Sequence, residues 1–179
     1  MTGSVPPRPL LFLDVDGPLI PFGGEAGHHP TYAAGPDSVA GPGAAGAHPL
    51  LARIDPAHGA RLVALPCEVV WATTWGDDAN ACVAPRLGLP ELEVLSWPEA
   101  TAADEALDLR NGLHAKTRLL IERAAGRPFA WVDDEITDRD RVWVAAHHPG
   151  PALLHRVDPR RGLTAADFTA LDSWLRQPS

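Results

Sequence analysis

The chain has 179 residues, of which 45% are hydrophobic, and its formal net charge is −8 at pH 7. This length and apolar content suffice for one domain with a substantial core and exclude an intrinsically disordered chain. The acidic balance, with no basic patch in the sequence, argues against nucleic acid or an anionic membrane as the main partner and favours a small soluble molecule or a protein.

The first predicted element is a buried strand over residues 10–15, which carries Asp14 and is followed at once by Asp16. A run of four apolar residues bounded by turn residues is typical of such a strand. Two carboxylates one residue apart at its end repel each other. A local departure of this kind from the residues that favour folding is typical of a functional site. A divalent cation, which prefers oxygen ligands, would relieve the repulsion. The alternative is an ordinary Asp-Gly turn that closes the strand.

Residues 19–49 form a long segment that is rich in Gly, Pro, Ala and His and shows little of the hydrophobic periodicity of a helix or a strand. A segment of this length without regular structure in a compact domain is usually functional or mobile, so we expect a flap here. Residues 50–54, which follow this segment, are predicted to form a short strand. Asp55 and Pro56 then begin a helix that runs to about residue 65, because Pro is favoured at the first helical position.

The rest of the chain alternates between strands and helices. Strands are expected at residues 67–72, 92–95, 129–132 and 152–157, and helices at residues 77–88, 115–125 and 164–175, the last begun by a capping box of Thr164 and Asp167. Residues 96–113 are predicted to be a polar loop, and residues 138–147 are ambiguous. This alternation predicts an α/β fold with a mainly parallel sheet, as one domain over residues 1–179 with the flap at residues 19–54 inserted in it.

Reactive polar residues follow three of the predicted strands. They are Asp14 and Asp16 on the first, Thr73 and Thr74 on the second, and Asp133 and Asp134 on the fourth. Ligands of open α/β sheets bind at the carboxyl ends of the strands, so these residues are expected to converge on one edge. Lys116, the one lysine beside 14 arginines, begins the helix before the fourth strand and can reach the same edge. The carboxylates could bind a cation, and the hydroxyl and ammonium groups could bind an anion. This combination suits phosphoryl transfer, which needs charge neutralisation and positioning of the phosphate.

These four segments resemble, in order, the four motifs of the haloacid dehalogenase (HAD) superfamily of phosphohydrolases. Asp14-Val15-Asp16-Gly17 resembles the first motif, Thr73 the second, Lys116 the third, and residues 133–138 the acidic fourth. A lone DxD is a weak signal, whereas four motifs in order over residues 10–138 are a strong one. The resemblance implies a Rossmann-like three-layer sandwich with a small flap or minimal cap after the first strand.

The resemblance also implies a mechanism and a magnesium site. Asp14 would attack phosphorus to form an aspartyl-phosphate, and Asp16 would act as general acid and then as general base. Thr73 and Lys116 would bind the phosphoryl oxygens. Mg²⁺ would be held by Asp14, the backbone carbonyl of Asp16 and Asp134, with Asp133 beside them as a supporting residue. The expected partner is a small phosphorylated substrate, with no nucleic acid and no membrane, and the sequence does not indicate an oligomeric state.

The sequence departs from the family pattern in places. Pro18 stands where Thr or Val often follows DxDG. Thr74 stands where Gly or Asn is usual, so either threonine could contact phosphate, with Thr73 favoured by strand register. The fourth motif can be read as a pair of aspartates or as Asp134 to Asp138, and both readings place the main metal ligand at Asp134. A phosphotransferase of the same fold, or a non-catalytic module that binds phosphate, metal or a protein, is the alternative to a phosphatase.

Other conspicuous residues have ordinary explanations. Cys67 and Cys82 are too far apart for a CxxC motif and are expected to be buried thiols. The histidine pairs at residues 28–29 and 147–148 lack a third ligand at zinc spacing. Residues 1–8 lack the apolar segment of a signal peptide, and no apolar run approaches the ~20 residues of a membrane span, so we expect a cytoplasmic protein.

Three residues after the second motif are candidates for lining the pocket: Trp75, Asp77 and Asn80. Helix capping explains Asp77 equally well.

Overall fold

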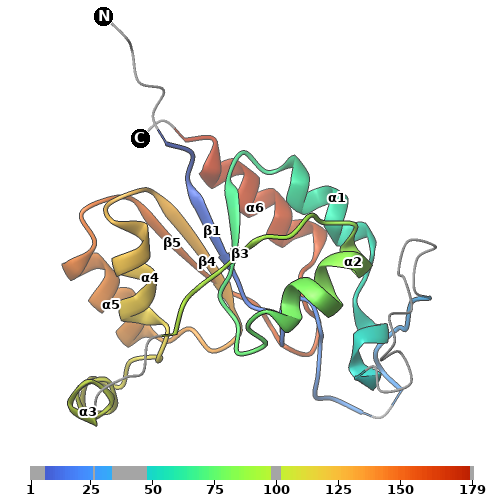
Figure 1. Cartoon of the computed structure of the whole chain (residues 1–179), viewed down its shortest axis with the longest axis horizontal. Coiled ribbons are helices and arrows are strands. Elements are labelled where there is room, and N and C mark those ends of the chain that lie inside the picture. The colour runs from blue at the N-terminus through green and yellow to red at the C-terminus, as the bar shows by residue number, and fades with distance from the viewer. Residues whose placement is uncertain (1–6, 26, 34–47, 98–101, 178–179) are drawn as a thin grey trace, which may run out of the picture.

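The computed structural model describes residues 7–25, 27–33, 48–97 and 102–177. Five strands form one sheet in the order β3-β2-β1-β4-β5, and all of their pairings are parallel (Figure 1). The strands are β1 (Leu10–Leu13), β2 (Glu68–Trp71), β3 (Glu93–Val94), β4 (Phe129–Asp133) and β5 (Ala152–Arg156). The helical segments are η2 (Pro49–Arg53), α1 (Ala57–Ala64), η3 (Ala79–Val83), α2 (Ala84–Leu87), α3 (Ala102–Asn111), α4 (Thr117–Ala124), α5 (Asp138–His147) and α6 (Ala165–Leu175).

The sheet is the middle of three layers. Side chains of a strand point alternately to its two faces, so the fully buried β1 contributes to two separate clusters. Leu11 and Leu13 pack in a cluster that includes residues of α1, α2 and α6, whereas Leu10 and Phe12 pack in one that includes residues of α4 and α5. Figure 1 shows α1 and α6 on one side of the sheet and α4 and α5 on the other. The predicted α/β sandwich is thereby confirmed.

The register of the sheet brings the ends of its central strands together. Leu13 of β1 lies opposite Trp71 of β2 and Val132 of β4. The backbone continues this pairing for one more residue, because the Asp14 N–H donates to the carbonyl of Val132 at 3.0 Å. Residues that follow β1, β2 and β4 therefore emerge side by side at the carboxyl edge of the sheet.

Two predictions of local structure are wrong, and an ambiguous segment is settled. Residues 50–54 were expected as a strand, but η2 forms a 3-10 helix there, with Pro49 at its first position. Residues 102–111, expected within a polar loop, form α3. The ambiguous residues 138–147 form α5, which begins with a capping box of Thr137 and Asp140.

Much of the flap predicted at residues 19–54 lies outside the described residues, namely residue 26 and residues 34–47. Backbone hydrogen bonds hold its described parts. Phe22 donates to the carbonyl of Pro159, outside the flap, at 2.8 Å, and Tyr32 donates to that of Ala52, within the flap, at 2.7 Å. Within the described parts of the chain, no helix has both the length and the apolarity that crossing a membrane requires.

Candidate active site

Asp14 lies at the centre of the carboxyl edge, one residue beyond β1. Its side chain is buried, with Oδ1 accepting the N–H of Val15 at 2.7 Å and Oδ2 accepting Lys116 Nζ at 2.7 Å. Burial, opposed by the Lys116 ammonium and assisted by the charge of Asp133, raises the pKa of Asp14 to about 7. A carboxylate in this setting is costly to ionise unless more positive charge is supplied.

Lys116 is the buried cation of the site, positioned immediately before α4. Its Nζ lies 2.7 Å from Asp14 Oδ2 and 2.6 Å from Asp133 Oδ2, and the residue is only 3% exposed. Burial alone would lower the pKa of Lys116, but the charges of the two aspartates and their hydrogen bonds outweigh burial and raise it. The ammonium is therefore charged at neutral pH and bridges the ends of β1 and β4.

Three carboxylates gather around this cation. Asp14, Asp133 and Asp134 are all buried, and each offers an oxygen within 4.8 Å of the other two. Burial, and next the charge of Asp133, raise the pKa of Asp134 as well. One ammonium cannot balance three buried carboxylates, and a hard divalent cation takes such oxygens as ligands. The donor set and its charge therefore fit a divalent metal.

The main chain of Gly17 is packed against Asp134. A Cβ at residue 17 would lie 2.6 Å from Asp134 Oδ1, and the φ of Gly17 is +85°, a left-handed conformation that side chains disfavour. The carbonyl of Asp134 in turn accepts Arg156 Nε at 2.8 Å. Glycine after Asp16 thus allows the turn that follows β1 to approach the acidic turn after β4.

Asp133 has its oxygens engaged by other groups. Oδ2 accepts both Lys116 Nζ and, at 3.2 Å, Trp131 Nε1, while Oδ1 accepts the N–H of Glu135 at 2.9 Å. These contacts fix Asp133 behind Lys116. The supporting role that the sequence predicts for Asp133 stays a prediction.

Asp16 is half-buried and lies apart from the three clustered carboxylates. Its Oδ2 accepts the indole N–H of Trp75 at 3.0 Å. The turn that follows is closed by a hydrogen bond from the Gly17 N–H to the carbonyl of Ile20 at 3.0 Å. Trp75, which the sequence suggested as a pocket residue, thus holds the predicted acid and base in one orientation.

Thr73 and Thr74 follow β2 at the same edge. Thr73 is fully buried, and its Oγ1 accepts the N–H of Trp75 at 3.4 Å, which leaves its own O–H to donate; Thr74 is exposed. The preference for Thr73 as the phosphate contact stays a prediction.

Asp77 and Asn80 were also candidates for the pocket. Asp77 is exposed, and Asn80 accepts Trp71 Nε1 at 2.9 Å and donates to the carbonyl of Leu92 at 2.8 Å. Asn80 therefore joins η3 to β2 and to the start of β3, and its role is structural.

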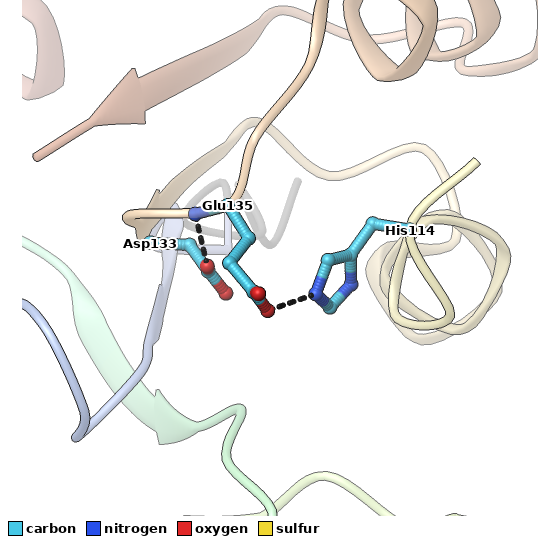
Figure 2. A group of neighbouring side chains, drawn as sticks. All are labelled: His114, Asp133 and Glu135. Atoms are coloured by element: carbon cyan, nitrogen blue, oxygen red, sulfur yellow. Dashed lines mark hydrogen bonds and ion pairs between the residues drawn. The ribbon is translucent and has the colours of Figure 1, made fainter. Parts of the chain in front are cut away.

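His114, which the sequence does not mark as a site residue, and Glu135, which lies in the acidic motif but has no predicted role, lie beside Asp133 (Figure 2). His114 Nδ1 accepts the N–H of Lys116 at 3.1 Å, so in the neutral ring the proton is on Nε2, which lies 3.2 Å from Glu135 Oε2. Both ring nitrogens are thus occupied by hydrogen bonds. His114 orients the backbone of Lys116, and its position two residues before that lysine was the signal available in the sequence.

Asp140 anchors the same loop from α5. Its Oδ1 accepts the N–H of His114 at 2.9 Å and the Thr117 hydroxyl at 2.6 Å, while Oδ2 accepts the N–H and hydroxyl of Thr137 at 2.8 and 2.6 Å. Burial alone would raise the pKa of Asp140, but these hydrogen bonds outweigh it and lower the pKa. One carboxylate therefore caps α5 and fixes the residues on both sides of Lys116.

Asp140→Asn should lower the free energy of unfolding by about 3 kcal/mol, because an amide nitrogen replaces an oxygen that accepts two donors. The lowered pKa means that the carboxylate stabilises the fold fully above its unfolded pKa. The difference in the free energy of unfolding between the variant and the wild-type protein should have its full size at pH 7. It should shrink as the pH falls below about 3.8. Denaturant unfolding at several pH values measures it.

The matched control is Asp167→Asn, which removes the same capping box from α6. Both variants should lose stability, but only Asp140→Asn should lower kcat, since only Asp140 contacts the loop of Lys116. Equal kcat in the two variants would mean that Asp140 has no positioning role.

The comparisons with known proteins agree with this geometry. The family model described as the HAD domain in Swiss Army Knife RNA repair proteins matches residues 10–168, which include every residue of the cluster. No curated protein and no solved structure matches the chain significantly. HAD domains generally use a divalent metal, and the three buried carboxylates offer oxygen ligands for one. The chain therefore belongs to the HAD superfamily, in the family of HAD domains of Swiss Army Knife RNA repair proteins.

Proposed function

We propose that the chain is a Mg²⁺-dependent phosphatase that hydrolyses a phosphomonoester through an aspartyl-phosphate. The observation that carries the proposal is the buried cluster in which Lys116 lies 2.7 Å from Asp14 and 2.6 Å from Asp133, with Asp134 adjacent. Covalent phosphoryl transfer needs an oriented nucleophile and fixed positive charge, and the cluster supplies both.

In the first step a carboxylate oxygen of Asp14 attacks phosphorus, and the bond from phosphorus to the ester oxygen breaks. The leaving oxygen takes a proton from Asp16, which Trp75 holds in place. In the second step Asp16 takes a proton from water as that water attacks the aspartyl-phosphate, which releases phosphate and restores Asp14. Lys116 and Thr73 bind the phosphoryl oxygens. Asp14, Asp134 and the backbone carbonyl of Asp16 would hold Mg²⁺, which would supply positive charge between the nucleophile and the phosphate.

Two substrate classes follow from two different observations. The net charge of −8 favours a small phosphorylated metabolite, whereas the family is described from RNA repair proteins, which favours a terminal phosphate on RNA. RNA ends are the better candidate because the family match covers residues 10–168, while net charge says little about one local site.

The test is turnover of an aryl phosphate with Mg²⁺, followed by a panel of 3′- and 5′-phosphorylated RNA oligonucleotides and small phosphorylated metabolites. We expect Mg²⁺-dependent release of phosphate that EDTA abolishes, with the highest kcat/KM on an RNA end. Binding of phosphate without any turnover would favour a non-catalytic module, and transfer of phosphate to a second substrate would favour a phosphotransferase.

Asp134→Ala should weaken Mg²⁺ binding more than about 100-fold, beyond the 10–100-fold typical of supporting residues, because it removes a direct ligand. Asp138→Ala is the matched control, since Asp138 is fully exposed at the start of α5. Calorimetric titration with Mg²⁺ compares them. Equal affinities in the two variants would contradict the assignment of Asp134.

A further inference from the structure

A cavity of about 330 Å³ lies next to the turn that follows Asp16, outside the carboxylate cluster. It is lined by four segments: the turn at residues 18–21, the flap at residues 28–32, residues 53–58 at the junction of η2 and α1, and the loop at residues 160–164 before α6. The loop is attached to the turn, because the N–H of Leu163 donates to the carbonyl of Pro18 at 2.9 Å. Pro18, two residues after Asp16, therefore belongs both to the turn that follows β1 and to the wall of this cavity.

The cavity concentrates positive charge in an acidic chain. Arg53, Arg160 and Arg161 line it, although the chain as a whole has a net charge of −8. Within the described residues, none of their guanidinium groups forms an ion pair with a carboxylate, whereas several other arginines do. Those are Arg118, Arg123, Arg127, Arg141 and Arg176.

The carboxylate in the lining is already occupied. Asp55 accepts the N–H of Ala57 at 2.9 Å, and a hydrogen bond to Tyr32 contributes to the raised pKa of that tyrosine, after burial and the charge of Asp55. Arg53 donates to the carbonyl of Pro21 at 2.9 Å, which fixes its guanidinium at the wall of the cavity. Arg53 is thus held at the wall of the cavity beside the exposed Arg160 and Arg161, and among the described lining residues three guanidinium groups face one carboxylate, that of Asp55.

We propose that this cavity binds a second phosphate group of the substrate, one that is not hydrolysed. The proposal rests on the phosphatase function above. Guanidinium groups bind phosphate through paired N–H donors, and three of them beside the catalytic turn suit a group attached to the same molecule as the reacting phosphate. That group is either a phosphodiester of an RNA strand or the second phosphate of a small bisphosphate.

Binding is measured by calorimetry in an Asp14→Asn background, so that no turnover is needed. The probes are adenosine 3′-monophosphate, adenosine 5′-monophosphate, adenosine 3′,5′-bisphosphate and a 3′-phosphorylated diadenosine nucleotide. We expect the bisphosphate, the dinucleotide or both to bind at least about tenfold more tightly than either monophosphate. Arg160→Gln/Arg161→Gln should remove this tighter binding. Because both side chains are exposed, we expect the variant to fold, and circular dichroism verifies that it does.

The control is Arg123→Gln/Arg176→Gln, which removes two charges from surface ion pairs elsewhere and should keep the tighter binding. If only the dinucleotide binds more tightly than the monophosphates, the ligand of the cavity is a phosphodiester. If only the bisphosphate does, the ligand is the second phosphate of a small molecule. The proposal is overturned if neither probe binds more tightly than the monophosphates, or if the tighter binding persists in Arg160→Gln/Arg161→Gln. Failure of the wild-type protein to hydrolyse any phosphate would refute the phosphatase function separately.

Discussion

Asp14→Asn should reduce kcat by at least about 10⁴-fold, because an amide cannot form the aspartyl-phosphate. The fold should persist, since Lys116 keeps its ion pair with Asp133 and one of the crowded buried charges is removed. Steady-state hydrolysis of an aryl phosphate measures kcat. Rapid quenching with labelled substrate should trap a base-labile phosphoprotein from the wild-type protein and none from the variant.

The control for this change is Asp172→Asn, which makes the same substitution at an exposed residue of α6 that pairs with Arg176. Its kcat and its labelling should match those of the wild-type protein. Asp14→Asn with wild-type kcat would end the covalent mechanism.

Lys116→Ala should lower both catalysis and stability. Without the ammonium, Asp14 and Asp133 are buried without their cationic partner, so we expect the free energy of unfolding to fall by about 3–5 kcal/mol. Loss of fixed charge in the transition state should lower kcat by about 10²–10³-fold, and not merely raise KM. Activity assays at saturating substrate and denaturant unfolding measure the two effects.

A second change separates these effects. Lys116→Ala/Asp133→Asn removes one of the unpaired carboxylates and should recover part of the stability while kcat stays low. Lys116→Arg should also be impaired, because a planar guanidinium does not fit where Nζ lies 2.7 and 2.6 Å from two carboxylates. A fully active Arg variant would show that the single lysine of the chain has no special role.

The sequence predicted the parts of the site that follow buried strands. The apolar runs before Asp14, Thr73 and Asp133 could be recognised locally, and a parallel sheet necessarily brings their ends to one edge. The contacts of Trp75 with Asp16 and of His114 with Lys116 could not be predicted. They depend on the path of loops after the strands, where neither periodicity nor composition specifies which side chains meet.

The errors in the fold prediction have related physical causes. α3 lacks an apolar face that periodicity could detect, and its Leu109 is 82% exposed. The apolar residues 50–54 were assigned as a strand, although Pro49 favours the start of a helix. For α5 the signal was present, since Thr137 and Asp140 have the same spacing as Thr164 and Asp167. The spacing that predicts α6 therefore also indicates the start of α5, at the end of the acidic motif.

The four hydrogen bonds of the Asp140 carboxylate join two segments that are separate in the sequence, the first turn of α5 and the loop of Lys116, into one cooperative unit. The first turn of α5 and the loop of Lys116 share a single carboxylate, so neither can open without releasing the other. Fraying of the helix therefore disturbs the charge balance around Asp14. On the proposed mechanism, the orientation of Asp14 therefore depends on the start of a helix that contains none of the proposed reacting groups.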